Sequence, residues 1–229
     1  MYVVMKFVDK INYFFMSKML DWCSSYHQMS ATMWITFSLI IYMIVFILLK
    51  IVFGSYKAHS DVVYEMCKAI EENNTVGFVK LLHEHDKCIN KFNADGYTPF
   101  LIACANGNTQ LVKLMLKKGA DVKLKSRKNE SPFYLAAFYY IRHPQYKNAT
   151  CIRELYYAGA NIDEPNNKGL TPLQMAATFG HTPLAKWLLL KNASMKTTPD
   201  PYVIACSQGH QDTAFLIWNI RKRNCLDFK

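Results

Sequence analysis

A two-helix unit that recurs along the chain limits its fold more than any other feature of the sequence. The best-preserved copy spans residues 95–122 (DGYTPFLIACANGNTQLVKLMLKKGADV). Asp95-Gly96 marks a turn, and Thr98-Pro99 places a hydroxyl N-cap before a proline at the first helical position. One apolar run then stops at Gly107, and a second stops at Gly119, which suits a left-handed helix C-cap. Two short helices of this kind cannot bury their apolar faces alone, so copies of the unit are expected beside it.

Such copies lie on both sides of this unit. The Thr-Pro-Phe entry at residue 98 returns as Ser131-Pro132-Phe133, 33 residues later, and as Thr171-Pro172-Leu173, 40 residues after that. A worn copy surrounds residues 78–82, and a further one begins at Asp200-Pro201. Stacked units of this type bury a continuous core between neighbours. The sequence therefore predicts an all-α solenoid of about five helix-turn-helix repeats.

The pattern resembles the ankyrin repeat, which has a period of about 33 residues and a T-P-L-H-x-A core. The resemblance covers residues 62–225, with repeats expected at 62–91, 93–125, 126–163, 166–196 and 198–225. The first repeat is polar enough to be an N-terminal cap, and the fifth ends on Arg221–Arg223 like a C-terminal cap. The third repeat carries an insertion at 138–148, rich in tyrosine, that either binds a partner or only packs locally.

A long apolar stretch precedes the repeats. Residues 31–49 contain no charged residue, and with Ile51–Phe53 the stretch reaches the length of about 20 residues that crosses a bilayer. Residues 31–53 are therefore predicted to form one transmembrane helix, followed by a hinge at 54–61. Residues 1–30 are predicted to form an amphipathic helix at the membrane interface, or a helix that packs on another part of the protein.

Nearby cations and cysteine usage bear on location. Lys50 and Lys57 follow the span closely, which favours a single-pass protein with its repeats in the cytoplasm. The seven cysteines form an odd number without a CxxC pair, as in proteins with reduced thiols. Glycosylation sequons argue the other way, and the organelle is not indicated; the sequons stand at Asn73, Asn129, Asn148 and Asn192.

Composition and motifs exclude several classes of function. The net charge of +10 suits an acidic partner or an anionic membrane surface, but no nucleic-acid-binding motif accompanies it. No nucleophile elbow, phosphate-binding loop, HExxH motif or carboxylate pair is present. His181 and His210 follow glycine in the interhelical turns, where the ankyrin resemblance implies a structural role. The sequence thus predicts no enzyme, no metal, no cofactor and no small-molecule substrate.

The resemblance implies a protein-binding surface made of turn fingers and inner helices. The fingers would be residues 93–97, 125–130 and 166–170, and cations from Lys117 to Lys128 would attract an acidic segment of the partner. The histidine of the T-P-L-H motif is replaced in every repeat, which predicts the loss of a hydrogen bond between neighbouring fingers. The predicted contact residues are Tyr97, Asn106, Lys125, Arg127, Lys128, Tyr134, Phe138, Tyr139, Leu170, Gln174 and Phe179.

These features predict a non-catalytic, membrane-anchored ankyrin-repeat scaffold that binds a cytosolic protein and holds it at a membrane. Confinement of this kind raises the effective concentration of the bound protein. An accessory subunit of a larger membrane complex, assembled through the transmembrane helix, is the alternative. Interfaces between membrane helices are rich in small residues, and Ser38 is the main support for such an interface in the span.

Overall fold

The computed structural model describes residues 31–143 and 149–226, with side chains over 38–50, 60–143 and 149–223. The chain divides into two compact units, Met1–Tyr56 and Lys57–Lys229. The predicted amphipathic helix at 1–30 lies outside the described residues.

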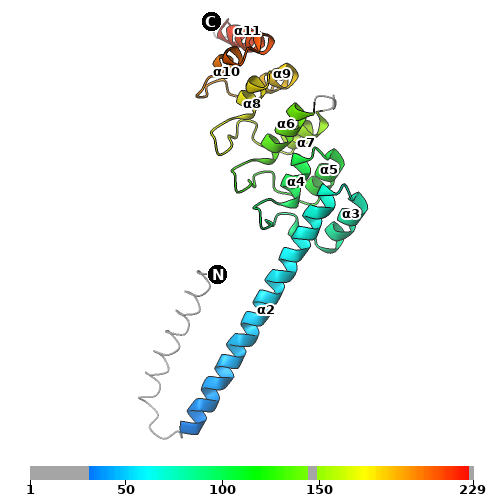
Figure 1. Ribbon diagram of the computed structural model, residues 1–229, viewed down its shortest axis with the longest axis vertical. Coiled ribbons are helices and arrows are strands. Elements are labelled where there is room, and N and C mark those ends of the chain that lie inside the picture. The colour runs from blue at the N-terminus through cyan, green and yellow to red at the C-terminus, as the bar shows by residue number, and fades with distance from the viewer. Residues whose placement is uncertain (1–30, 144–148, 227–229) are drawn as a thin grey trace. The chain divides into compact units, whose positions relative to one another are not determined.

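The first described element is α2, which runs without a break from Ala31 to Glu71 (Figure 1). The hinge predicted at 54–61 is wrong in this respect, because these residues are helical. They include one glycine and no proline, and a single glycine weakens a helix by about 1 kcal/mol without ending it. In the part of the chain that the structure describes, no helix is long and apolar enough to cross a membrane.

The second unit is a stack of helix pairs (Figure 1). The end of α2 pairs with α3 (Thr75–Glu84), which a short 3-10 turn (Asp86–Cys88) follows. The four later pairs are α4 (Pro99–Ala105) with α5 (Thr109–Lys117), α6 (Pro132–Arg142) with α7 (Thr150–Tyr157), α8 (Pro172–Thr178) with α9 (Thr182–Leu190), and α10 (Pro201–Ser207) with α11 (Gln211–Leu226). The predicted all-helical solenoid is confirmed, and the described residues contain no strand.

Side-chain caps start the first helix of each regular pair. Thr98, Ser131 and Thr171 each accept a hydrogen bond from the backbone N–H three residues later, at 3.1–3.3 Å. Proline follows each cap at the first helical position. Both features satisfy or remove N–H groups that a helix start leaves without partners. The helix ends also follow the prediction, since Gly107 and Gly119 have φ values of 62° and 86°.

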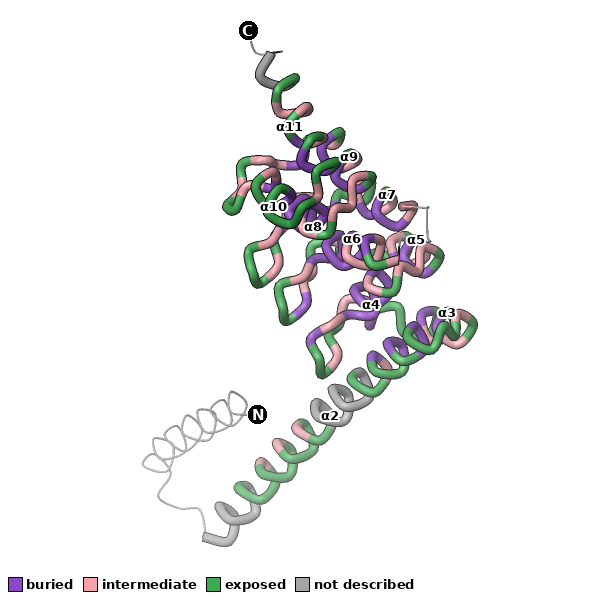
Figure 2. The backbone as a smooth tube through the Cα atoms, turned by 45° about the horizontal axis from the view of Figure 1, so that its top comes forward, coloured by how far each residue is buried: buried purple, intermediate pink, exposed green. Residues whose placement is uncertain are grey.

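A continuous core fills the space between the helix pairs (Figure 2). Phe100, Phe133 and Leu173, which follow the conserved-position prolines of successive repeats, are almost completely buried. Each of these side chains packs in the same cluster as its neighbours along the stack. The core therefore depends on stacking, as the sequence predicts.

The third repeat differs from its neighbours in the length of its first helix. α6 has 11 residues, whereas α4 and α8 have 7. The additional residues, Phe138 to Arg142, extend the helix by about one turn at 3.6 residues per turn. Part of the predicted insertion is thus helical and is placed precisely, beside the first helices of the neighbouring repeats.

Candidate functional site

The loops between helix pairs form turn fingers that project from one side of the stack (Figure 2). Each finger is closed by a backbone hydrogen bond, from Asn93 to Tyr97, from Ser126 to Glu130 and from Asn166 to Leu170, at 2.8–3.0 Å. Neighbouring fingers are also joined by backbone hydrogen bonds, from Arg127 N to Gly96 O and from Asn167 N to Lys128 O. The fingers therefore form one connected surface.

Side chains add further hydrogen bonds between fingers, and this corrects a sequence-based expectation. Asn166 Nδ2 donates to the Tyr134 hydroxyl at 2.9 Å, and Gln174 Nε2 donates to Pro199 O at 2.6 Å. Tyr134 and Gln174 stand where the ankyrin motif has histidine, so the expected loss of a link does not occur at these two positions. Tyr97 Oη also donates to Glu130 Oε2 at 2.8 Å.

The same contacts remove two residues from the predicted binding surface. Gln174 has no exposed surface, and Tyr134 is buried as well. Burial raises the pKa of the Tyr134 hydroxyl, and the Glu130 carboxylate raises it further. The prediction that these two side chains contact a partner is wrong, because the next finger and the core cover them.

Two phenylalanines from neighbouring repeats meet on the inner-helix surface. Phe138 of α6 and Phe179 at the end of α8 lie edge to face, with ring centroids 6.4 Å apart. Phe179 is 51% exposed, and the Arg142 guanidinium lies 5.4 Å from the centre of the Phe138 ring. We name these three residues the aromatic site. It combines exposed apolar area with a cation, and aromatic residues and arginine are enriched at binding hot spots.

Arg142 is absent from the predicted contact residues, although the sequence contains a signal for it. It stands four residues after Phe138, and residues at this spacing share one face of a helix. The signal depends on α6 continuing through the insertion. An insertion taken as a loop gives no reason to connect the two side chains.

Asn106 and Tyr139, both predicted contact residues, line one small cavity at the inner ends of the second and third repeats. Its volume is about 320 Å³, and Asn108 and Tyr140 contribute to its wall. The Tyr139 ring covers Gly107 and stacks on the His143 ring with centroids 4.1 Å apart. Tyr139 is therefore largely engaged in local packing, while Asn106 remains exposed.

The predicted basic strip is partly neutralised within the chain. Lys125 forms a salt bridge with Glu164, and the Arg127 guanidinium donates to Ala94 O at 3.1 Å. Lys128 is exposed, whereas Leu170 is half-buried near the base of its finger. The cations that remain exposed on this edge are Lys117, Lys118, Lys123, Arg127 and Lys128.

The described histidines and cysteines have structural surroundings. His181 Nδ1 accepts a hydrogen bond from Leu184 N at the start of α9, and His210 Nε2 donates to Thr178 O. Burial raises the pKa of the Cys67 thiol to about 12 and that of Cys104 still further, which keeps both protonated. Among the residues whose positions are described, no cluster of His, Cys, Asp or Glu could hold a metal ion.

Two family models of ankyrin repeats match the chain, over residues 66–145 and 140–189. The chain belongs to the ankyrin-repeat family. Ankyrin repeats bind proteins, so this ankyrin-repeat protein is a protein-binding scaffold.

Curated relatives share parts of the ankyrin-repeat region. The chain is 35% identical over 74 residues to the Notch-regulated ankyrin repeat-containing protein A of Danio rerio, which is 31% of this chain and 66% of the relative. It is 32% identical over 83 residues to the corresponding Xenopus tropicalis protein, covering 35% of this chain and 71% of that one. The match to the E3 ubiquitin-protein ligase KEG of Arabidopsis thaliana, 32% identical over 104 residues, covers 45% of this chain but only 6% of the ligase. Such partial matches carry the repeat and not the activity of the whole ligase.

Proposed function

We propose that this ankyrin-repeat protein is a membrane-anchored, non-catalytic scaffold that holds a protein partner on its inner-helix surface. The aromatic site is the observation that carries the binding part of this proposal. A half-exposed phenylalanine next to a second ring and a guanidinium can be desolvated by a partner at little conformational cost, because the rings already contact one another. The connected fingers beside it supply polar groups for the rim of an interface.

Substitution of the aromatic site tests this proposal. Phe179→Ala removes an exposed ring without opening the core, and Phe138→Ala/Phe179→Ala removes the pair. Recovery of the partner with full-length protein is expected to fall by about tenfold or more, as at other aromatic hot spots. Leu190→Ala is the matched control, because Leu190 is an exposed apolar side chain on α9. Equal recovery with all variants would contradict the proposal.

The partner is proposed to present an acidic segment to the basic strip. Because Lys125 is engaged with Glu164, charge reversal belongs at cations that are exposed, such as Lys123 and Lys128. Lys123→Glu/Lys128→Glu is expected to slow association and to reduce its dependence on salt. Association that is unchanged at low ionic strength would exclude an acidic segment as the ligand of this strip.

The anchor is proposed to be the apolar part of α2. No charged residue occurs between residues 31 and 49. Large apolar side chains are exposed on consecutive turns and on all sides of the helix, including Leu39, Ile40, Met43, Ile44 and Ile47. A helix that is apolar all round requires either a protein core or lipid around it. Lipid satisfies this requirement without any partner chain.

Alkaline carbonate extraction tests the anchor. Wild-type protein is expected to remain in the membrane pellet, and Ile40→Lys/Ile44→Lys to be released. Each lysine in the middle of a span costs about 3 kcal/mol for insertion. Ile40→Leu/Ile44→Leu is the control that keeps the apolar character. Complete extraction of the wild-type protein would overturn the anchor and leave the aromatic site untouched.

The repeats are proposed to lie in the cytoplasm, and the chain carries its own reporter of sidedness. Asn73, Asn129 and Asn192 are exposed in turns with φ near 60°, and each belongs to a glycosylation sequon. Cytoplasmic repeats predict that glycosidase treatment leaves the electrophoretic mobility unchanged. A shift in mobility would place the repeats on the luminal side.

A further inference from the structure

The last helix pair exposes apolar side chains at positions that the preceding pair buries. Counted from the caps Thr171 and Asp200, Gln174 corresponds to Val203 and Leu189 to Trp218. Gln174 and Leu189 are 0% and 5% exposed, whereas Val203 and Trp218 are 56% and 45% exposed. The α10–α11 pair thus repeats the surface on which a further repeat would stack.

We name this surface the C-terminal face; its apolar residues are Tyr202, Val203, Cys206, Phe215 and Trp218. A groove of about 610 Å³ lies between α10 and α11 on it. Phe215 is 64% exposed, and its ring stacks on that of Trp218 with centroids 6.4 Å apart. Arg221, which the sequence assigns to a polar C-terminal cap, instead forms a salt bridge with Asp200 at 2.8 Å.

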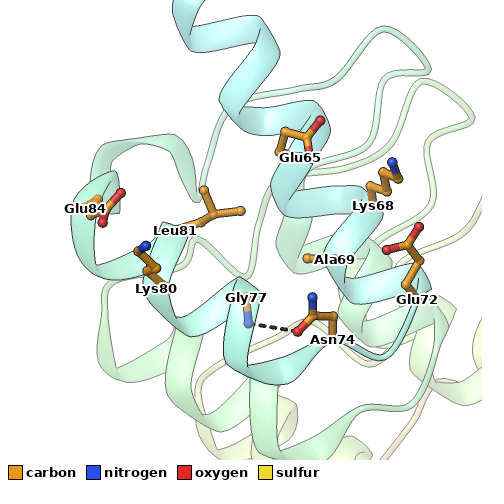
Figure 3. A pocket seen from close by; sticks show the side chains of 9 residues that line it. All are labelled: Glu65, Lys68, Ala69, Glu72, Asn74, Gly77, Lys80, Leu81 and Glu84. Carbon is orange, nitrogen blue, oxygen red and sulfur yellow. Dashed lines mark hydrogen bonds between the residues drawn. The ribbon is translucent and has the colours of Figure 1, made fainter.

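The opposite end of the stack has a different character. The groove between α2 and α3 is lined by charged side chains, including Glu65, Lys68 and Glu84 (Figure 3). Gly77 N donates to Asn74 Oδ1 at 2.9 Å there, which caps α3 (Figure 3). This end matches the polar cap that repeat proteins require. A head-to-tail contact between copies would place the apolar C-terminal face on charged groups, which is unfavourable.

The order of charges on α11 points to a second copy of the chain as the occupant. Asp212, Phe215, Trp218 and Lys222 follow one another at spacings of three or four residues, and all four are exposed. The exposed side of α11 is therefore acidic at its start, aromatic in the middle and basic at its end. Such a surface complements itself when two copies run antiparallel.

We propose that two copies of this protein associate through their C-terminal faces, with α11 against α11 in antiparallel orientation about a twofold axis. Asp212 of each copy then faces Lys222 of the other, five residues on either side of residue 217. Phe215 and Trp218 of both copies form the centre of the contact, where aromatic side chains contribute most. The contact is isologous and closes on itself.

The size of the face indicates a weak dimer. A fully buried aromatic side chain covers 150–250 Å², so two half-exposed rings from each copy bury about 400 Å² together. With Val203, Cys206 and the charged rim, the interface reaches the lower end of the 1,200–2,000 Å² range of specific complexes. Association is therefore expected at micromolar concentrations.

Co-capture of two differently tagged full-length chains in mild detergent tests the proposal. Wild-type chains are expected to capture each other in a concentration-dependent manner. Asp212→Lys with itself, and Lys222→Asp with itself, place like charges opposite one another, so each self-capture falls at least about tenfold. Mixing Asp212→Lys with Lys222→Asp restores both opposite-charge pairs and is expected to restore capture.

Further variants separate this contact from others. Trp218→Ser is expected to weaken capture by about thirtyfold, while Leu190→Ser, an exposed apolar residue outside the face, leaves it unchanged. Circular dichroism melting verifies that both variants fold. A chain that stays monomeric up to 100 µM would overturn the proposal. Self-capture that ignores both the charge exchange and Trp218→Ser would also overturn it, since contact then occurs elsewhere, for example through residues 31–53. Neither result bears on the aromatic site or the anchor.

Discussion

Individual side chains in this stack replace the usual histidine without losing its function. Tyr134 and Gln174 differ from histidine in size and chemistry, yet each forms a hydrogen bond with the next finger. The sequence shows that the histidine is missing but not how far its replacement reaches. That distance depends on the spacing of neighbouring repeats, which only the folded stack defines.

Gln174→Ala is expected to destabilise the protein by about 1–3 kcal/mol, because it leaves buried polar groups without partners. Gln174 Oε1 accepts from Thr171 N at 2.8 Å, and Gln174 Nε2 donates to Pro199 O. Urea denaturation measures the change. Gln208→Ala, an exposed residue in the next repeat, is expected to alter stability by less than about 0.5 kcal/mol. Similar effects of both substitutions would contradict the buried network.

Protonation of His181 is expected to weaken α9. Burial, including the Tyr140 ring 4.9 Å away, lowers the pKa of His181 in the folded protein. The unfolded chain therefore binds the proton first as pH falls, so the free energy of unfolding decreases as pH drops through the unfolded pKa of about 6.5. Protonated Nδ1 also cannot accept from Leu184 N, and an N-cap is worth about 1 kcal/mol.

Urea denaturation between pH 7.5 and pH 5 measures this dependence. His181→Asn retains a side-chain cap but does not titrate, so its stability is expected to change less over this interval. A slope equal to that of the wild type would assign the titration to other groups.

At the scale of whole elements, the start and end of each helix follow from local chemistry and could be predicted. Thr98-Pro99 and Gly119 have the roles that their residue types indicate. The unbroken helix through 54–61 and the extension of α6 could not be predicted in this way. Both segments lack a strong stop signal before their observed ends, and neighbouring helices decide how far a weakly encoded helix continues.

The contact between the second and third repeats is tested by two glycines. Both have positive φ, which costs a residue with a Cβ about 1 kcal/mol or more. A Cβ on Gly107 would lie 2.1 Å from the Tyr139 ring, whereas none would meet another atom within 4 Å at Gly119. Gly107→Ala is therefore expected to cost at least about 2 kcal/mol and Gly119→Ala about 1 kcal/mol in thermal unfolding. Equal costs would mean that Tyr139 does not cover Gly107.

At the scale of the whole molecule, the repeat period predicted the fold well and the binding surface poorly. Positions such as Tyr134 and Phe138 both fall on the first helix of a repeat, but one is buried under a finger and the other meets Phe179. Exposure at these positions depends on contacts between repeats 30 to 40 residues apart. The same reason explains the C-terminal face, since α11 ends in basic residues that resemble a cap while its side against a further repeat stays apolar.

Proximity labelling in cells, with the labelling enzyme at the C-terminus of the full chain, tests the scaffold at a membrane most directly. We predict cytosolic neighbours, with one set that disappears for Phe138→Ala/Phe179→Ala and is retained for Leu190→Ala. Luminal neighbours, or a set of neighbours that is the same for all three proteins, would contradict the account.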